Sequence, residues 1–480
     1  NWYHIDPLFY GQQNTNIKPG NVPEATFSNN FMRQVLETEL FPSKTPPNGQ
    51  PVVMSVLDLA FYPGERGPYN YDVLPTSLSS GILSNGRLKD PETRWGGIMR
   101  RLETNDFQSA NIEYVQFWMM DPFNSDYNSG TYPDMDANSK PSGELYINLG
   151  NISEDIVKDG KMVYENGLPG NPSGSNANLP TIESNIGKVP LISPISNSFV
   201  NDPADRPFQD VGYDGLPDSA EARKFSSFIS ALLASGASGV DVQAALDDPS
   251  SDRYHFFRGN DYDGLPNLQG NTLHRYKKYN NAEGNSPTEE QYPDAGIPSA
   301  ATNNPNIEDV NKDNTLSETE NYYQYKIKIS PQDLDPNNVG QNYIVNVLDG
   351  AATIGNTQKN VKWYQFKVPV TEFEKSVGSI EGFNSIRFMR VFMKGFDKPV
   401  VCRIARMELV RSDWRRYAFD LQKPGEYTAN DDNTTTFDVS AVSLQENGEK
   451  KPVNYVIPPG INQQQNIQTT NSVLLNEQAL

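Results

Sequence analysis

Short segments in which apolar and polar positions alternate recur along the chain, and a period of two residues is typical of β-strands. Residues 112–120 are apolar on both faces, which predicts a central strand that is covered on two sides. Leu145, Ile147 and Leu149 alternate with Tyr, Asn and Gly, which predicts a strand that is buried on one face only. Further strands are predicted at residues 52–59, 322–329, 343–348, 363–370, 386–393 and 400–410.

A helical period replaces this alternation in the middle of the chain. Phe225, Phe228, Ile229 and Leu232 are spaced like the apolar face of an amphipathic helix. The predicted helices span residues 221–234 and 240–246. The surrounding residues 152–320 are rich in Asn, Asp, Gly and Pro, which favour turns, and we interpret them as an insertion between two strand-rich blocks.

Together these patterns predict a mainly β fold, a jelly-roll-like β-sandwich split by a long loop-rich insertion with a few short helices. The order of the strand motifs resembles the galactose-binding-like jelly rolls of carbohydrate modules, and such a fold does not by itself fix a function. The predicted regions are an extended N-terminal segment (1–50), the first part of the sandwich (51–151), the acidic insertion (152–320), the second part of the sandwich (321–417) and a polar linker or start of another module (418–480).

The composition narrows the possible partners. The chain has 60 Asp and Glu against 40 Lys and Arg, a net charge of -20, which excludes nucleic-acid binding as a main role. Cys402 is the single cysteine, so no internal disulfide and no cysteine-based zinc site are possible, and its apolar neighbours predict a buried thiol. No run of 18 apolar residues predicts a transmembrane helix. The chain begins at Asn1 without an initiator methionine, and we expect it to be part of a longer protein.

Residues 309–320 have the spacing of an EF-hand calcium loop, in which six to eight oxygen atoms surround one ion. Asn314 stands where that loop has glycine, and Asn tolerates the left-handed backbone better than most residues. Flanking helices are not predicted, so we expect a bare calcium loop; a solvated loop of Asx turns is the alternative. The candidate ligands are Asp309, Asn311, Asp313, Thr315, Ser317 and Glu320.

Two further acidic loops lie in the same insertion. The first, residues 210–221, carries the candidate ligands Asp210, Asp214, Asp218 and Glu221. The second carries Asp261 and Asp263 and repeats the Tyr-Asp-Gly-Leu-Pro of residues 213–217. Asp-Gly turns are common without a metal, yet three such loops together predict Ca²⁺ as a structural cofactor that orders the insertion.

The sequence shows little sign of the residue motifs that are typical of enzyme active sites. His4, His255 and His274 are far apart in sequence, without a metal-binding spacing, and residues 236–239 are not a nucleophile elbow. We therefore expect the chain not to be an enzyme. Trp118 and Trp363 lie within predicted strands, so we expect them to pack in the core rather than to stack on a sugar.

A stretch rich in Lys and Arg contrasts with the acidic remainder of the chain. It runs from residue 387 to residue 416. Because the whole chain is acidic, we expect these side chains to pair with carboxylates within the fold or on an acidic partner surface.

Several long motifs together resemble the SprA/Sov family, the outer-membrane translocon of the bacterial type IX secretion system, which is also needed for gliding motility. The resemblance extends over essentially the whole chain. The motifs are WYHIDPLFY (2–10), LDLAFYPGERGPYNYD (57–72), RWGGIMR (94–100), ANIEYVQFWMMDPF (110–123), LYINLGNISEDI (145–156), QDVGYDGLPD (209–218), DVNKDNTLSETE (309–320), VKWYQFKVP (361–369) and ELVRSDWRRY (408–417).

This resemblance implies a role in protein transport at the cell outer membrane. Members of the family form a very large transmembrane barrel that exports folded cargo proteins and works with a small partner barrel and a plug protein. The segment lacks serial strands with aromatic girdles, so we expect it to lie outside the barrel wall, in the cap or vestibule, facing the cell surface or the vestibule. The alternative is a surface carbohydrate-binding or adhesin-type β-sandwich module.

Overall fold

In the computed structural model, the described part of the chain comprises residues 2–6, 9, 24–44, 49–127, 135–157, 159–165, 179–193, 212–253, 255–257, 262, 272–277, 306–411, 447–451, 454–457, 464–467 and 473–476. All structural statements below concern these residues.

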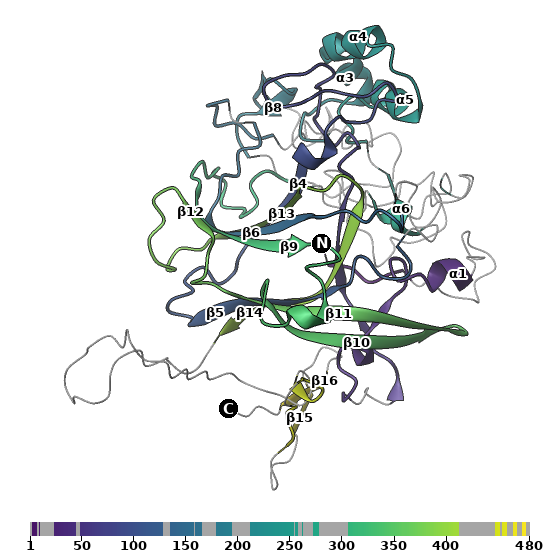
Figure 1. The fold of residues 1–480 in the computed structure, drawn as a ribbon. Coiled ribbons are helices and arrows are strands. Elements are labelled where there is room, and N and C mark those ends of the chain that lie inside the picture. Colours follow the sequence, from purple (N-terminus) through teal and green to yellow (C-terminus); the bar gives the residue numbers. More distant parts are fainter. Residues whose placement is uncertain are drawn as a thin grey trace.

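Two five-stranded antiparallel sheets face each other and form a β-sandwich (Figure 1). The first sheet has the order β10 (Ile344–Ile354), β11 (Thr357–Pro369), β5 (Ile112–Met120), β14 (Val400–Arg411) and β3 (Val56–Phe61). The second has the order β12 (Lys375–Val377), β9 (Asn321–Ile329), β6 (Gly143–Asn151), β13 (Phe388–Lys394) and β4 (Trp95–Arg101). Both sheets mix strands from before and after the insertion, so the predicted split sandwich is confirmed.

Strand β5 occupies the centre of the first sheet, between β11 and β14, as its two apolar faces predict. Phe117 is buried against Phe366 of β11, with the ring centroids 5.0 Å apart. On the other face Trp118 meets Phe41 edge-on at 6.4 Å. The outer face of this sheet is therefore covered by the N-terminal segment, in α1 (Glu24–Phe27), β1 (Val35–Leu36) and α2 (Glu37–Leu40).

For β6 the prediction of one buried face was only half right. Leu145, Ile147 and Leu149 are fully buried, but Asn148 between them is buried as well. The side chains of Gln324 and Arg390 on the neighbouring strands lie against it. A polar residue can be covered in this way when its neighbours supply hydrogen bonds, which an apolar–polar pattern does not reveal.

Four arginines in residues 387–411, the described part of the basic stretch, pair with carboxylates of the chain, one of the two outcomes expected from sequence. Residues 412–416 of the stretch lie outside the described residues. The guanidinium of Arg403 is completely buried and donates to both carboxylate oxygens of Asp58, each at 2.9 Å. It also donates to three backbone carbonyls, those of Asn30, Phe31 and Arg33. Arg403 therefore ties the N-terminal segment to the sandwich with every donor used. The thiol of Cys402, next to it, is buried and free, as predicted.

The insertion contributes a small helical layer at one end of the sandwich (Figure 1). Phe225, Phe228 and Leu232 pack there with Val73, and Tyr71 stacks on Phe225 at 4.0 Å. The single helix predicted at residues 221–234 is broken at its residue 225. The helices are α3 (Asp218–Lys224), α4 (Ser226–Ala234), α5 (Val240–Asp247) and α6 (Thr272–Tyr276).

Shorter elements complete the described part of the chain. They are the strands β2 (Val53–Met54), β7 (Thr181–Glu183), β8 (Lys188–Pro190), β15 (Gln464–Ile467) and β16 (Val473–Asn476), with 3₁₀ turns at Pro91–Thr93 and Pro336–Asn338. None of the helices described is long and apolar enough to span a bilayer.

Candidate functional site

The residues predicted to bind calcium fall into two groups. Asp210, Asp261 and Asp263 lie outside the described residues. All other candidates are described: they belong to the 309–320 loop, to the turn that leads into α3 and to α3 itself.

The 309–320 loop uses its side-chain oxygens to hold its own backbone. Asp309 accepts hydrogen bonds from the amides of Asp313 at 3.1 Å and Asn314 at 2.8 Å. Asp313 accepts from the amide of Thr315 at 2.9 Å. Asn314 has a φ of 62°, the left-handed conformation expected at the position where EF-hand loops carry glycine. The loop is thus a tight series of Asx turns.

Two of the candidate ligands of this loop lie against arginines of the second sheet or its entry. Glu320 makes a bidentate ion pair with Arg390 of β13, with both N–O distances 3.1 Å. Asp313 lies 3.3 Å from Arg387. Glu154 accepts from the amides of Asn311 at 3.0 Å and Ser317 at 3.1 Å, so a carboxylate from outside the motif holds the loop together.

The second predicted loop does bring its carboxylates together. Asp214 and Glu221 have carboxylate oxygens within 4.8 Å of each other and of Asp252, and Asp218 and Asp248 form an overlapping group with Glu221. We call these five residues the Asp214 cluster. Asp218 and Glu221 lie on α3, whereas Asp248 and Asp252 follow α5.

Most oxygens of the cluster accept one hydrogen bond from a fixed donor. Ser250 donates through its hydroxyl to Asp214 at 2.7 Å and through its amide to Glu221 Oε2 at 2.9 Å. Tyr69 donates to Asp252 at 3.0 Å. Glu221 Oε1 is buried and has no hydrogen-bond partner among the described residues. The carboxylates are therefore oriented, while one oxygen points into the cluster unused.

Among the described residues, two arginines lie beside the five carboxylates of the cluster. Arg253 pairs with Asp218 at 2.7 Å, and Arg66 donates to backbone carbonyls, including that of Asp248 at 3.0 Å. Burial, followed by repulsion between the carboxylates, raises the pKa of Glu221 to about 8 and that of Asp252 to about 9.

The same burial raises the pKa of Asp214 to about 7, although its hydrogen bond from Ser250 acts in the opposite direction. Buried carboxylates close to one another resist ionisation unless a cation compensates them. The ligand set contains only carboxylate oxygens, which hard divalent cations such as calcium prefer. Asp248 and Asp252 were missed by sequence reasoning, because they belong to no loop template and reach the site only through the packing of α5.

A comparison with known families identifies the kind of protein in which these sites lie. The family model SprA_N, a motility related/secretion protein, matches residues 227–480, which is more than half of the chain. The chain belongs to this family. The resemblance predicted from the sequence motifs is thereby confirmed, and the chain is a motility- and secretion-related protein. No match to it was found among the curated proteins.

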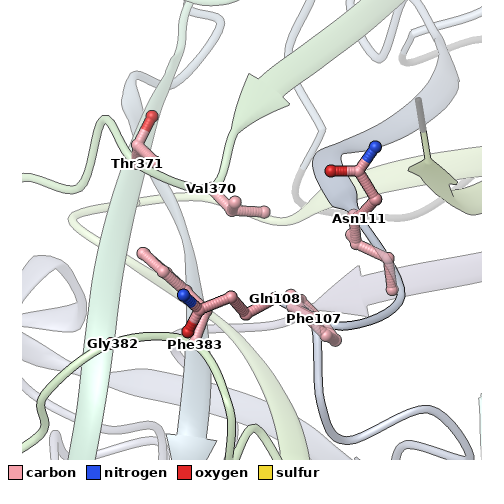
Figure 2. A pocket seen from close by; sticks show the side chains of 8 residues that line it. Phe107, Gln108, Asn111, Val370, Thr371, Gly382 and Phe383 are labelled. Carbon is pink, nitrogen blue, oxygen red and sulfur yellow. The ribbon is translucent and has the colours of Figure 1, made fainter. Parts of the chain in front are cut away.

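A pocket of this secretion-related chain lies at one end of the sandwich (Figure 2). It has a volume of about 250 Å³ and lies between the start of β5 and the segment that follows β11. The lining residues include no carboxylate, histidine, lysine or cysteine, so they offer apolar contact and amide hydrogen bonds rather than acid–base chemistry. They are Phe107, Gln108, Asn111, Ile112, Val370, Thr371, Gly382 and Phe383.

Proposed function

We propose that the chain is a non-catalytic part of an outer-membrane protein-secretion machine of the type IX kind, where it contributes to the cap or vestibule of the export barrel. Its family supports the secretion role. Its proposed partners are the rest of the translocon barrel, the small partner barrel, the plug protein and the secreted cargo. The observation that carries the proposal is a sheet edge that no strand among the described residues covers.

Strand β4 ends the second sheet and, among the described residues, pairs only with β13. Trp95 is 71% exposed and Ile98 is 47% exposed on this strand. An edge strand with apolar side chains can add a strand from another chain, and free-standing proteins usually protect such edges. Strand β4 is therefore the surface at which we expect the neighbouring part of the translocon to dock.

The position of the tryptophans makes the carbohydrate-binding alternative less suitable. Trp118 and Trp363 are buried in the core, 2% and 0% exposed, so they have no ring face to offer a sugar. The exposed Trp95 belongs to the sheet edge instead. The place of Trp95 on an edge strand suits strand addition better than a sugar platform.

We further propose that the Asp214 cluster binds a structural Ca²⁺. The ion would compensate the negative charge of the buried carboxylates. Glu221 Oε1, which has no hydrogen-bond partner among the described residues, would bind the ion. Tyr69 comes from the segment that follows β3, and Asp252 from the end of the helical layer. Calcium would thus fasten the helical layer to the sandwich.

Site-specific photo-crosslinking in the living bacterium tests the docking edge. A photoreactive amino acid replaces Ile98, and the matched control replaces Val240, which is 77% exposed on α5. We expect position 98 to crosslink to another component of the secretion machine and position 240 not to do so. The absence of adducts at position 98, or the same adducts at both positions, would overturn the proposal, as would glycan binding that is lost in Trp95→Ala.

A further inference from the structure

A second group of carboxylates joins the segment after β6 to the residue that precedes the 309–320 loop. Asp155, Glu165 and Glu308 have carboxylate oxygens within 4.8 Å of one another. Asp155 follows β6, Glu308 directly precedes the loop, and Glu165 comes from the segment between them in the sequence. No motif in the sequence joins these three residues, and only the fold brings them together.

Glu165 is the unusual member of this group. Its side chain is 1% exposed, and neither carboxylate oxygen has a hydrogen-bond partner among the described residues. Asp155 Oδ1 is also buried without a partner there. Burying an ionised carboxylate without a compensating cation costs roughly several kcal/mol, even after the surrounding protein has relaxed. Three buried oxygens on two neighbouring carboxylates therefore have no hydrogen-bond partner among the described residues.

Glu308 is held in place for such a role. Its Oε1 accepts from the amide of Ile156 at 2.7 Å, and its Oε2 accepts from the amide of Glu165 at 2.6 Å. A carboxylate oxygen has two lone pairs, so an oxygen that accepts from one amide can also bind a metal ion. The two amides thus orient Glu308.

Among the described residues, little positive charge lies near this group. Asp159 adds a fourth carboxylate, and Lys161 lies 3.3 Å from it with its side chain 44% exposed. One solvated ammonium cannot balance four carboxylates of which two are almost fully buried. The group needs a cation or must hold protons.

We propose that Asp155, Glu165 and Glu308 bind a calcium ion that fastens the start of the 309–320 loop to the end of β6. The ligands are all carboxylate oxygens, which favours a hard cation over zinc or copper. Magnesium keeps several of its waters, whereas calcium accepts a cage of protein oxygens, so the burial of Glu165 and Glu308 favours calcium.

Calcium here would order the loop as well as its own ligands. Glu154, which is adjacent to Asp155, accepts the loop amides of Asn311 and Ser317. An ion on Asp155 and Glu308 would therefore support the contacts that Glu154 makes with the loop. The competing explanation is a proton shared by Glu165 and Glu308, because burial raises the pKa of both groups.

Calcium titration of the 480-residue chain by calorimetry separates the two explanations. Glu165→Gln keeps the side-chain shape but loses the charge, and Glu372→Gln, at an exposed position, is the matched control. We expect Glu165→Gln to bind one calcium ion fewer than the wild type, and Glu372→Gln to bind the same number. Unchanged stoichiometry in Glu165→Gln, with equal or higher stability without calcium, would establish the shared proton and overturn the proposal.

Hydrogen exchange on the wild-type chain gives an answer even if Glu165→Gln does not fold. The amides of Ile156 and Glu165 bond to Glu308, so calcium should slow their exchange at least tenfold relative to chelator. Glu221→Gln removes the Asp214 cluster as a calcium site and should leave this local protection intact. Exchange that is the same with calcium and with chelator in both proteins would refute the site, whatever the export role of the chain.

Discussion

The buried pair of Arg403 and Asp58 provides the sharpest test of how the N-terminal segment is attached. In Arg403→Met the side chain keeps its apolar length, but Asp58 and the carbonyls of Asn30, Phe31 and Arg33 lose their donor. Removing one partner of a buried ion pair costs about 3–5 kcal/mol, because the other charge stays buried and unpaired. At about 2–4 °C per kcal/mol, the melting temperature should fall by about 6–20 °C.

The matched control is Arg387→Met, since Arg387 is 43% exposed and its ion pair with Asp313 is 3.3 Å long. An exposed pair of this kind contributes about 0–1 kcal/mol. Urea unfolding of both variants and the wild type measures the two free energies of unfolding. In the double variant Arg403→Met/Asp58→Leu the loss should be smaller than in Arg403→Met alone, because no charge is left unpaired. Equal losses for Arg403→Met and Arg387→Met would refute the reasoning.

Three further predictions concern the calcium sites and the sheet edge. Calcium at about 100 times its dissociation constant should raise the free energy of unfolding by about 2.7 kcal/mol per site. The same melting temperature in calcium and in chelator would contradict this prediction. In chelator, stability should fall as the pH rises from about 4 and should level off above about 9, because folding raises the pKa of Asp214, Glu221 and Asp252 to about 7, 8 and 9. Between these limits the folded state holds protons that the unfolded state has released. Urea unfolding at several pH values measures the slope, and stability that rises with pH over this range would contradict the prediction. The double variant Trp95→Lys/Ile98→Lys should have a melting temperature within about 2–4 °C of the wild type, because both side chains are exposed. Surface delivery of cargo by this variant should drop at least tenfold. Normal delivery would argue against a docking edge.

The sequence determines much of this sandwich because its strands are buried in a regular pattern. Residues 112–120 were predicted as a central strand since both faces are apolar, and β5 lies between β11 and β14. The same reasoning failed at Asn148, because the neighbours that cover it come from strands far away in the sequence. It also did not predict that residues 24–44 cover the first sheet, an arrangement that depends on Arg403 in β14.

The candidate sites show the same limit more clearly. The spacing of residues 309–320 suggested a single calcium site, yet Glu320 turns to Arg390 of β13 and the loop is held by Glu154. Spacing alone could not reveal this, since both partners lie outside the motif. In the looser 210–221 motif, Asp214 and Glu221 do meet, but the cluster is completed by residues that only the packing of α5 supplies.

The export role is tested most directly in the bacterium that encodes the chain. An in-frame deletion of the sequence for the 480 residues should leave cargo proteins inside the cell envelope and stop gliding, and restoring the sequence should recover both. Labelling of surface-exposed cargo on intact cells measures the outcome. The account predicts a loss of surface cargo in the deletion strain, whereas normal amounts of cargo on its surface would contradict the proposed function.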